Sequence, residues 1–380
     1  MTNRRSLAAL VIVVVVVAAG CDVVRVSVSS ADAQANGPSR NVSLSADANL
    51  MAFDSAATNL VPGDTNGVSD VFVRNATTGT TTMLSVGRVT GPGNGPSTDA
   101  VVSADARYVA FRSSATNLVT GAPASGIYLR DLGSNTTTLV SKDANGTALD
   151  LVIPGPIAIS ATGRFVVFGG HFDVYRYDRQ AGVATRVLNA IRQPTGVSED
   201  GRYLATDTIV VTGVHSLAAA VFDLTTGQSV FVGPGDSWDT RITPDAKYVV
   251  YAFAPNCFPS SFPSCNAGAS GARLRNLQTG IEYPVLTTLG QPFAQVSALA
   301  LSNDANRIAI ATADNAYLYD RTTGAFTLVT VAKHTPETGN RPTREATISA
   351  DGTTVGFSSE ASNLIDNDTN AVADVSTRRL

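Results

Sequence analysis

The chain repeats one nine-residue phrase seven times, and this repetition constrains its fold more than any other feature. One copy reads SADARYVAF from Ser103, and the other copies begin at Ser45, Ser160, Ser198, Thr243, Ser302 and Ser349. Successive copies begin 38 to 59 residues apart. A self-similar unit of this length over a whole chain is typical of solenoids, propellers and other repeat arrays.

Each unit contains the signals of four strands. Short apolar residues, such as PIAI before Ser160, predict a first strand, and the Asp-Gly or Asp-Ala step of the phrase predicts a tight hairpin turn. The apolar end of the phrase predicts a second strand that is covered on both faces. A third strand, DVFVRN from Asp70, alternates apolar and polar residues and is expected to expose one face. A second hairpin signal and a fourth strand follow it.

These units predict an all-β chain, folded as a seven-bladed β-propeller of four-stranded antiparallel blades. A sandwich or an open meander is the alternative, although neither requires one phrase to recur in every unit. The seventh unit stops after its third strand, at residues 374–380, while an unassigned strand lies at Val23–Ser29. The N-terminal strand is therefore expected to close the last blade. Residues 21–380 are expected to form a single propeller domain.

Residues 1–20 are interpreted as a signal peptide of the lipoprotein type. Two arginines precede a short apolar run, Leu7–Val17, and small residues lie directly before Cys21. This pattern resembles a bacterial lipoprotein signal, which implies lipid on Cys21 and an extracytoplasmic protein attached to the membrane only by that lipid. The alternative is an ordinary secretory signal cut after Ala33, which would release the protein and discard the strand at Val23–Ser29.

The other two cysteines agree with an oxidising compartment. Cys257 and Cys265 lie close together in the Pro-rich insertion NCFPSSFPSC and are expected to form a disulfide. Two unpaired thiols are the alternative.

Composition excludes some functions. The formal net charge is −4 and there is one Trp, so the chain offers no basic patch or aromatic platform for nucleic acid. No nucleophile elbow or phosphate-binding loop occurs, and the three histidines lie in different units: His171, His215 and His334. One Asp recurs at the same turn, which favours a structural role: Asp47, Asp105, Asp200, Asp245, Asp304 and Asp351. No catalytic residue is assigned.

Two long loops between second and third strands carry candidate calcium ligands. The first unit reads NLVPGDTNGVSDVF and the seventh reads NLIDNDTNAVADVS. The matched residues are Asp64, Asn66 and Asp70 in the first loop, and Asp368, Asn370 and Asp374 in the second. Oxygen ligands at positions 1, 3 and 7 resemble the start of a calcium-binding loop. A plain Asp-Asn-Gly turn is the alternative, because no Glu follows at position 12. No other cofactor is expected.

The phrase, the DVFVRN-type strand and the following T-T-G turn together resemble the TolB-like, WD-repeat-like propeller repeats of bacterial envelope proteins. The best matches are Ser103–Phe111, Ser198–Leu204 and Asp70–Gly79, and the resemblance covers Val23–Leu380. It implies the propeller fold. The sequence has no counterpart of the α/β domain that precedes the propeller in TolB, nor of the hydrolase domain in propeller peptidases, so neither role is expected.

The sequence therefore favours a monomeric, non-enzymatic scaffold that binds an envelope protein or a surface glycan through its uneven loop face. The alternative is a propeller hydrolase or lyase, or a carbohydrate binder, which uses the central channel together with calcium.

Overall fold

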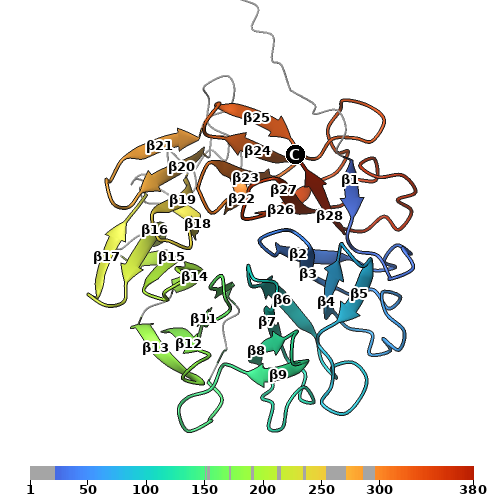
Figure 1. Cartoon of the computed structure of the whole chain (residues 1–380), viewed down its shortest axis with the longest axis horizontal. Helices are drawn as coiled ribbons and strands as arrows, with labels where there is room; N and C mark the ends of the chain where they lie inside the picture. Colours follow the sequence, from blue (N-terminus) through green and yellow to red (C-terminus); the bar gives the residue numbers. More distant parts are fainter. Residues whose placement is uncertain are drawn as a thin grey trace, which may run out of the picture.

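A computed structural model of the chain describes residues 22–149, 151, 155–170, 173–189, 192–211, 215–233, 237–253, 271–285 and 296–380. These residues form 28 strands in seven four-stranded antiparallel sheets. The sheets stand radially around a central axis as the blades of a propeller (Figure 1). The seven-bladed β-propeller predicted from the repeats is confirmed.

Blades 1 to 6 each use four consecutive strands, and the first strand of every blade lines the central channel. Blades 1 and 2 contain β2 (Ser39–Leu44), β3 (Leu50–Ser55), β4 (Asp70–Asn75), β5 (Thr80–Met83), β6 (Ser97–Val102), β7 (Tyr108–Ser113), β8 (Gly126–Asp131) and β9 (Thr136–Leu139). Blades 3 and 4 contain β10 (Ile157–Ile159), β11 (Phe165–Gly169), β12 (Asp173–Asp178), β13 (Val183–Asn189), β14 (Arg192–Val197), β15 (Tyr203–Val211), β16 (His215–Asp223) and β17 (Gln228–Phe231). Blades 5 and 6 contain β18 (Ser237–Ile242), β19 (Tyr248–Phe253), β20 (Gly271–Asn276), β21 (Glu282–Val285), β22 (Val296–Leu301), β23 (Arg307–Thr312), β24 (Ala316–Asp320) and β25 (Ala325–Leu328).

Blade 7 is closed by the N-terminal strand. Its own strands are β26 (Thr343–Ile348), β27 (Thr354–Ser359) and β28 (Asp374–Arg379), and β1 (Val23–Arg25) pairs antiparallel with β28 as the outermost strand. Figure 1 shows β1, in blue, beside β28, in dark red. The closure predicted from the two ends of the sequence is confirmed, and it gives β28 a partner on both edges.

The repeated phrase forms the turn between the first and second strands. In blade 2 the Ser103 hydroxyl donates to Asp105 at 2.5 Å and accepts the backbone N–H of Tyr108 at 2.9 Å. The same two hydrogen bonds recur in blades 1, 4, 5, 6 and 7. The residue after the Asp position has a φ between 54° and 74° in all seven copies. The structural role predicted for this Asp is confirmed.

The residues beside this turn also join neighbouring blades. The backbone N–H of Ala46 donates to the carbonyl of Ala104 at 2.9 Å, and the N–H of Ala350 donates to the carbonyl of Ala46 at 3.0 Å. Further links join Asp105 to Ala161, Glu199 to Pro244, and Asn303 to Ala350. These bonds surround one end of the channel and hold the blades in fixed relation.

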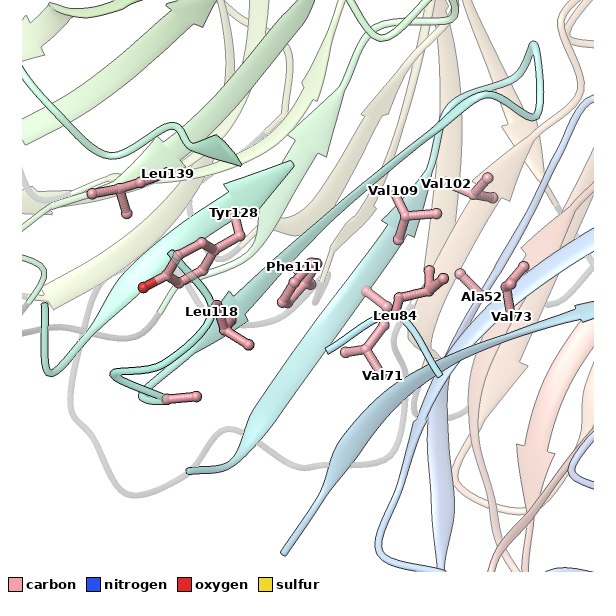
Figure 2. Packing of buried hydrophobic residues seen from close by; sticks show 12 residues of the cluster. Ala52, Val71, Val73, Leu84, Val102, Val109, Phe111, Leu118, Tyr128 and Leu139 are labelled. Atoms are coloured by element: carbon pink, nitrogen blue, oxygen red, sulfur yellow. The ribbon is translucent and has the colours of Figure 1, made fainter. Parts of the chain in front are cut away.

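The hydrophobic core lies between adjacent blades. In the cluster of Figure 2, Val71 and Val73 of blade 1 pack with Val109 and Phe111 of blade 2. Phe111 and Tyr128 are completely buried and stacked, with ring centroids 5.8 Å apart. Offset stacking of this kind adds to the gain from apolar burial.

The prediction that the third strand exposes one face is wrong for blades 1 and 2. Both β4 and β8 are buried up to their last residue. The polar position in β4 is tolerated because the Arg74 guanidinium donates to the carbonyl oxygens of Ser29 and Gly79 and to the Thr81 hydroxyl. Buried polar groups are stable when they are hydrogen-bonded in this way.

The described residues include no helix of the length and apolar character needed to cross a membrane.

Candidate functional site

The long loops lie on one face of the propeller. In blade 1, Ser39 at the start of β2 pairs with Ser55 at the end of β3, which pairs with Asp70 at the start of β4. The loop between β3 and β4 therefore emerges beside the start of the first strand, and the phrase turns lie at the opposite end. We call this side the long-loop face. It carries the extended loops 56–69, 114–125 and 360–373 of blades 1, 2 and 7.

Pairs of Asn side chains hold these three loops in place. The Asn36 N–H donates to Asn59 Oδ1 at 3.0 Å, and Asn36 Oδ1 accepts the N–H of Thr58 at 2.8 Å. Asn59 Nδ2 also donates to the carbonyl of Gln34. The same pattern joins Asn94 to Asn117 in blade 2 and Asn340 to Asn363 in blade 7. The sequence analysis missed these contacts, although a repeated Asn-x-Pro motif and a repeated Asn-Leu pair mark them.

The central channel forms a cavity of about 440 Å³ that is lined by the first strands of all seven blades. Small and apolar residues form most of its wall, including Val101, Ile159 and Ala300. Toward the long-loop face its lining is more polar: Asn41, Asp99, Thr195, Arg241 and Glu345. The sequence alone did not identify these residues, because they come from different blades and share no motif.

Asp54 is the centre of the polar group at this end of the channel. Its Oδ1 accepts hydrogen bonds from Asn41 Nδ2 at 2.7 Å and from the N–H of Asp99 at 3.3 Å. Burial raises the pKa of Asp54 to about 7; the bond from Asn41 opposes this rise, and the charges of Asp99 and Glu345 add to it. Arg112 pairs with Asp99 at 3.1 Å. Since its pKa lies close to neutrality, Asp54 can accept or donate a proton under physiological conditions.

Two residues of this group have strained backbones. Asn41 and Asp99 have φ values of 56° and 58°, in the left-handed region that non-glycine residues seldom adopt. Both lie at a β-bulge in the first strand of their blade. Strain of this kind is found frequently at functional sites.

Two other carboxylates make similar contacts between neighbouring blades. Asp207 of blade 4 accepts the backbone N–H groups of Asp239 and Thr240 in blade 5, at 2.8 and 3.1 Å. Glu345 of blade 7 accepts the N–H of Val42 in blade 1 at 3.2 Å. Since bulges leave such N–H groups without a partner strand, these carboxylates stabilise the contact between neighbouring blades.

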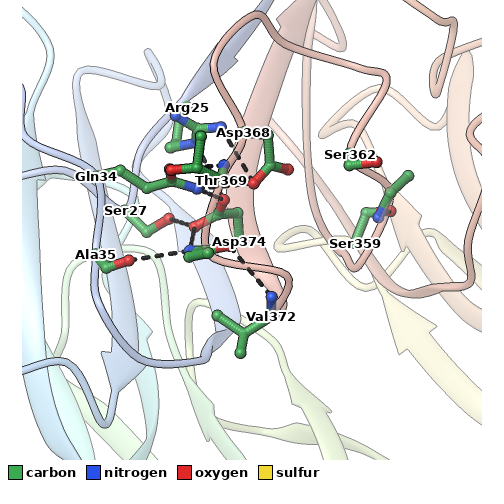
Figure 3. A network of polar contacts seen from close by, with 12 residues as sticks. Arg25, Ser27, Gln34, Ala35, Ser359, Ser362, Asp368, Thr369, Val372 and Asp374 are labelled. Carbon is green, nitrogen blue, oxygen red and sulfur yellow. Dashed lines mark hydrogen bonds and ion pairs between the residues drawn. The ribbon is translucent and has the colours of Figure 1, made fainter.

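In blade 7 the two acidic residues of the candidate calcium loop contact the N-terminal segment. Arg25 Nε lies 3.1 Å from Asp374 Oδ2, and Arg25 Nη2 lies 3.7 Å from Asp368 Oδ1. Gln34 Nε2 donates to one oxygen of each carboxylate, at 2.8 Å in both cases. Figure 3 shows this network, to which Ser27 adds a hydrogen bond with Asp374.

In blade 1 the corresponding residues have different partners. Asp70 accepts hydrogen bonds from Ser85 Oγ and Asn66 Nδ2, both at 2.6 Å. Asp64 is 7% exposed, and neither of its carboxylate oxygens has a hydrogen-bond partner of good geometry in the described part of the chain. Burial raises the pKa of Asp64, and it raises that of Asp70 to about 6.

The middle residue of each loop presents its amide nitrogen to the acidic group. Asn66 Nδ2 donates to Asp70, and Asn370 Nδ2 donates to Asp374 at 3.3 Å. The Oδ1 atoms of both residues accept a backbone N–H two residues later. Nowhere in the described ranges do three or more His, Cys, Asp or Glu side chains form a group that could hold a metal ion.

Several predicted residues lie outside the described residues: the signal peptide at residues 1–20 with Cys21, the cysteines Cys257 and Cys265, and His171. His215 begins β16 of blade 4. His334 lies in a blade 7 loop, with Nε2 at 2.6 Å from Asp366 Oδ1, and is 75% exposed.

No protein-family model and no curated protein matches the chain. Among solved structures, it is similar to TolB from Acinetobacter baumannii, with 12% identity, a TM-score of 0.46 and coverage of 76% of this chain. The chain spans 62% of the TolB chain.

Two other structures are similar over more of their length. A structure titled oligogalacturonate lyase in complex with manganese has 11% identity and a TM-score of 0.59, and the match covers 95% of this chain and 96% of that one. The hydrazine synthase of Kuenenia stuttgartiensis has 14% identity and a TM-score of 0.54, with coverage of 91% and 96%. At these identities the similarity shows a shared propeller fold and nothing about activity.

Proposed function

We propose that this chain is a non-enzymatic binding module that holds a protein partner on its long-loop face, outside the cytoplasm. The braced loops of blades 7, 1 and 2 are the observation that carries this proposal. Three neighbouring blades present long loops on the same face, and each loop is held by the same Asn pair. Since these loops are ordered before binding, association loses little conformational entropy.

Two further features support the proposal. The loop that leads from blade 1 to blade 2 exposes Val89, an apolar side chain with 79% exposure, on this face. The carboxylates Asp207 and Glu345 need no catalytic role to explain their presence, because both accept backbone N–H groups of the next blade. The lipoprotein-like N-terminal sequence adds the cellular setting: lipid on Cys21 would place the module at a membrane surface, with an envelope protein or a glycan as its ligand.

Affinity capture with matched variants tests this proposal. The wild-type propeller is used as bait in detergent-solubilised envelope, beside Val89→Glu on the long-loop face and Phe231→Glu on the outer strand of blade 4. Phe231 is also an exposed apolar residue, at 54%, and serves as the control. We expect one stoichiometric partner that binds wild type and Phe231→Glu equally and binds Val89→Glu about tenfold more weakly. Recovery of no partner, or equal binding to both variants, would contradict the proposal.

A second candidate function is binding or turnover of a small ligand or glycan in the channel, and the Asp54 group favours it. A carboxyl group with a pKa of about 7, hydrogen-bonded to two strained residues that line the cavity, suits a general acid or base. The manganese of the lyase complex is not carried over, because the described residues hold no metal-binding group of three or more acidic, His or Cys side chains. A glycan that binds wild type but not Asp54→Asn would favour this candidate.

A further inference from the structure

Blades 1 and 7 have the same outer-strand arrangement, so their loops can be compared position by position. Arg25 of β1 pairs with Ser376, and Met83 of β5 pairs with Phe72. Ser376 and Phe72 each follow, by two residues, the Asp that begins the third strand of the blade. Arg25 and Met83 therefore occupy the same position in the two blades.

Gln34 and Pro92 are equivalent in the same way. Isolated bridges join Val28 to Gln34 near blade 7, and Val86 to Pro92 in blade 1. In blade 7 the guanidinium of Arg25 and the carboxamide of Gln34 contact both carboxylates. The thioether and the pyrrolidine ring at these two positions of blade 1 can donate no hydrogen bond and carry no charge.

The acidic pair of blade 1 is nevertheless retained and buried. Asp64 is 7% exposed, and neither of its buried carboxylate oxygens accepts a hydrogen bond of good geometry from the described residues, although the backbone N–H of Asn66 approaches it. Asp64 and Asp70 have the same sequence spacing as Asp368 and Asp374, whose carboxylates both contact Gln34. A buried carboxylate without a donor or a counter-charge is strongly unfavourable. Asp64 therefore points to a missing positive partner.

The blade 7 loop shows that one atom can contact both carboxylates. Gln34 Nε2 alone lies 2.8 Å from an oxygen of Asp368 and from an oxygen of Asp374. A small cation placed in the corresponding position of blade 1 would reach Asp64 and Asp70 together.

We propose that blade 1 binds one calcium ion between Asp64 and Asp70, and that Arg25 and Gln34 take the place of such an ion in blade 7. The donors are carboxylate oxygens, and the shell is completed by backbone carbonyl oxygens and water, which is the chemistry that Ca²⁺ prefers. Asn66 is a positioning residue, because its Nδ2 donates to Asp70 and to the carbonyl of Gly93. The inference is independent of the partner proposed above.

Blade 2 supplies a natural control. Its shorter loop has Ala122 at the position of Asp64, counted from the Asn-Leu pair, and Gly126 at the position of Asp70. The second equivalence follows from hydrogen bonding, since the next backbone N–H donates to a Ser hydroxyl in both blades, Ser85 and Ser141. The two carboxylates are thus present together in blades 1 and 7 and absent together in blade 2, as expected of residues that share one ligand.

Calcium binding is measured on the full chain, after treatment with chelator, by titration calorimetry with CaCl₂ alone. We expect one ion per chain with a dissociation constant of about 10⁻⁴–10⁻³ M, because few protein ligands contribute. We also expect calcium to raise the melting temperature by about 2–5 °C. No binding, or two ions per chain, would overturn the proposal.

Matched variants locate the ion. Asp64→Asn should abolish the calcium response and, in chelator, should melt at the wild-type temperature or above it, because it removes an unpaired buried charge. Asp368→Asn, the equivalent change in blade 7, should retain the response even if it melts lower overall. An unchanged response in Asp64→Asn would overturn the proposal.

A transplant of the blade 7 partners provides an independent measurement. Met83→Arg combined with Pro92→Gln places the guanidinium and the carboxamide beside Asp64 and Asp70. This double variant should show the calcium dissociation constant weakened at least tenfold, with no loss of melting temperature in chelator. A double variant that folds and binds calcium as wild type does would refute the equivalence of the two sites.

Discussion

Blade 1 and blade 7 are built from the same motifs, but they obtain their outer strands differently. In blade 1 the outer strand, β5, follows directly after β4 in the chain. In blade 7 the outer strand is β1, which comes from the other end of the protein. The borrowed segment brings Arg25 and Gln34 to the acidic loop, and the continuous segment brings Met83 and Pro92. The same loop sequence therefore stands in two different electrostatic surroundings. A motif alone does not define a cation site; its neighbours across the sheet do.

The largest effect is expected when the guanidinium of Arg25 is removed from the acidic loop of blade 7. Arg25→Met places the blade 1 residue in blade 7 and leaves Asp368 and Asp374 buried without their counter-charge, with only the neutral donors Gln34, Ser27 and Asn370. Removal of one partner from a buried ion pair costs about 3–5 kcal/mol, and the loss should appear in denaturant unfolding in chelator. Met83→Arg is the matched change in blade 1 and should cost much less. Equal losses in the two variants would remove the distinction between the loops.

A smaller effect concerns Asp54, the buried carboxyl group of blade 1 that accepts hydrogen bonds from the channel residues Asn41 and Asp99. The folded-state pKa of Asp54 is raised to about 7 from an ordinary value of 3.8, so folding favours its protonated form. The resulting contribution of Asp54 to the free energy of unfolding is fully present below about pH 4 and is lost as the pH rises to about 7. The facing groups are Asn41, Asp99 and Glu345.

Asp54→Asn is neutral at every pH and should lack this dependence. Between pH 4 and pH 8 its free energy of unfolding should rise relative to wild type by roughly 2–4 kcal/mol. The measurement is a series of denaturant titrations over this range. A constant difference between the two proteins would mean that Asp54 titrates normally.

The smallest effect concerns the repeated turn. The position after the turn Asp is Ala48 in blade 1 and Gly352 in blade 7, with φ values of 55° and 74°. Ala48→Gly should stabilise the protein by about 1 kcal/mol, because a left-handed backbone strains alanine. Gly352→Ala should destabilise it by more, since the added Cβ would lie 2.8 Å from the Arg307 side chain. Melting temperatures test both, and an opposite order would contradict this account.

Much of the fold was predictable because its signals are local. The phrase encodes a turn whose Ser, Asp and left-handed residue lie within four positions of one another, as in Ser103, Asp105 and Ala106. The seven copies and the unpaired N-terminal strand then determine the blade number and the closure. The buried third strand was not predictable, because the partner of Arg74 at Ser29 comes from a distant segment.

The candidate site was only partly predictable. The acidic residues of both loops were identified from their spacing, but nothing in either loop distinguishes Asp64 from Asp368. The Asp54 group was missed, since Asn41, Asp99 and Glu345 meet only where three blades approach the axis.

The sequence by itself therefore determined the propeller, the number of its blades and the way in which it closes, because repeated short-range hydrogen bonds specify each blade. Only the tertiary structure decided which acidic loop is paired with an arginine of its own and which carboxyl group has its pKa raised by burial. The physical reason is distance along the chain. Blade 7 meets a segment from the other terminus, with contacts such as Ser27 to Asp374 across 347 positions, and charge and burial depend on such neighbours rather than on the motif.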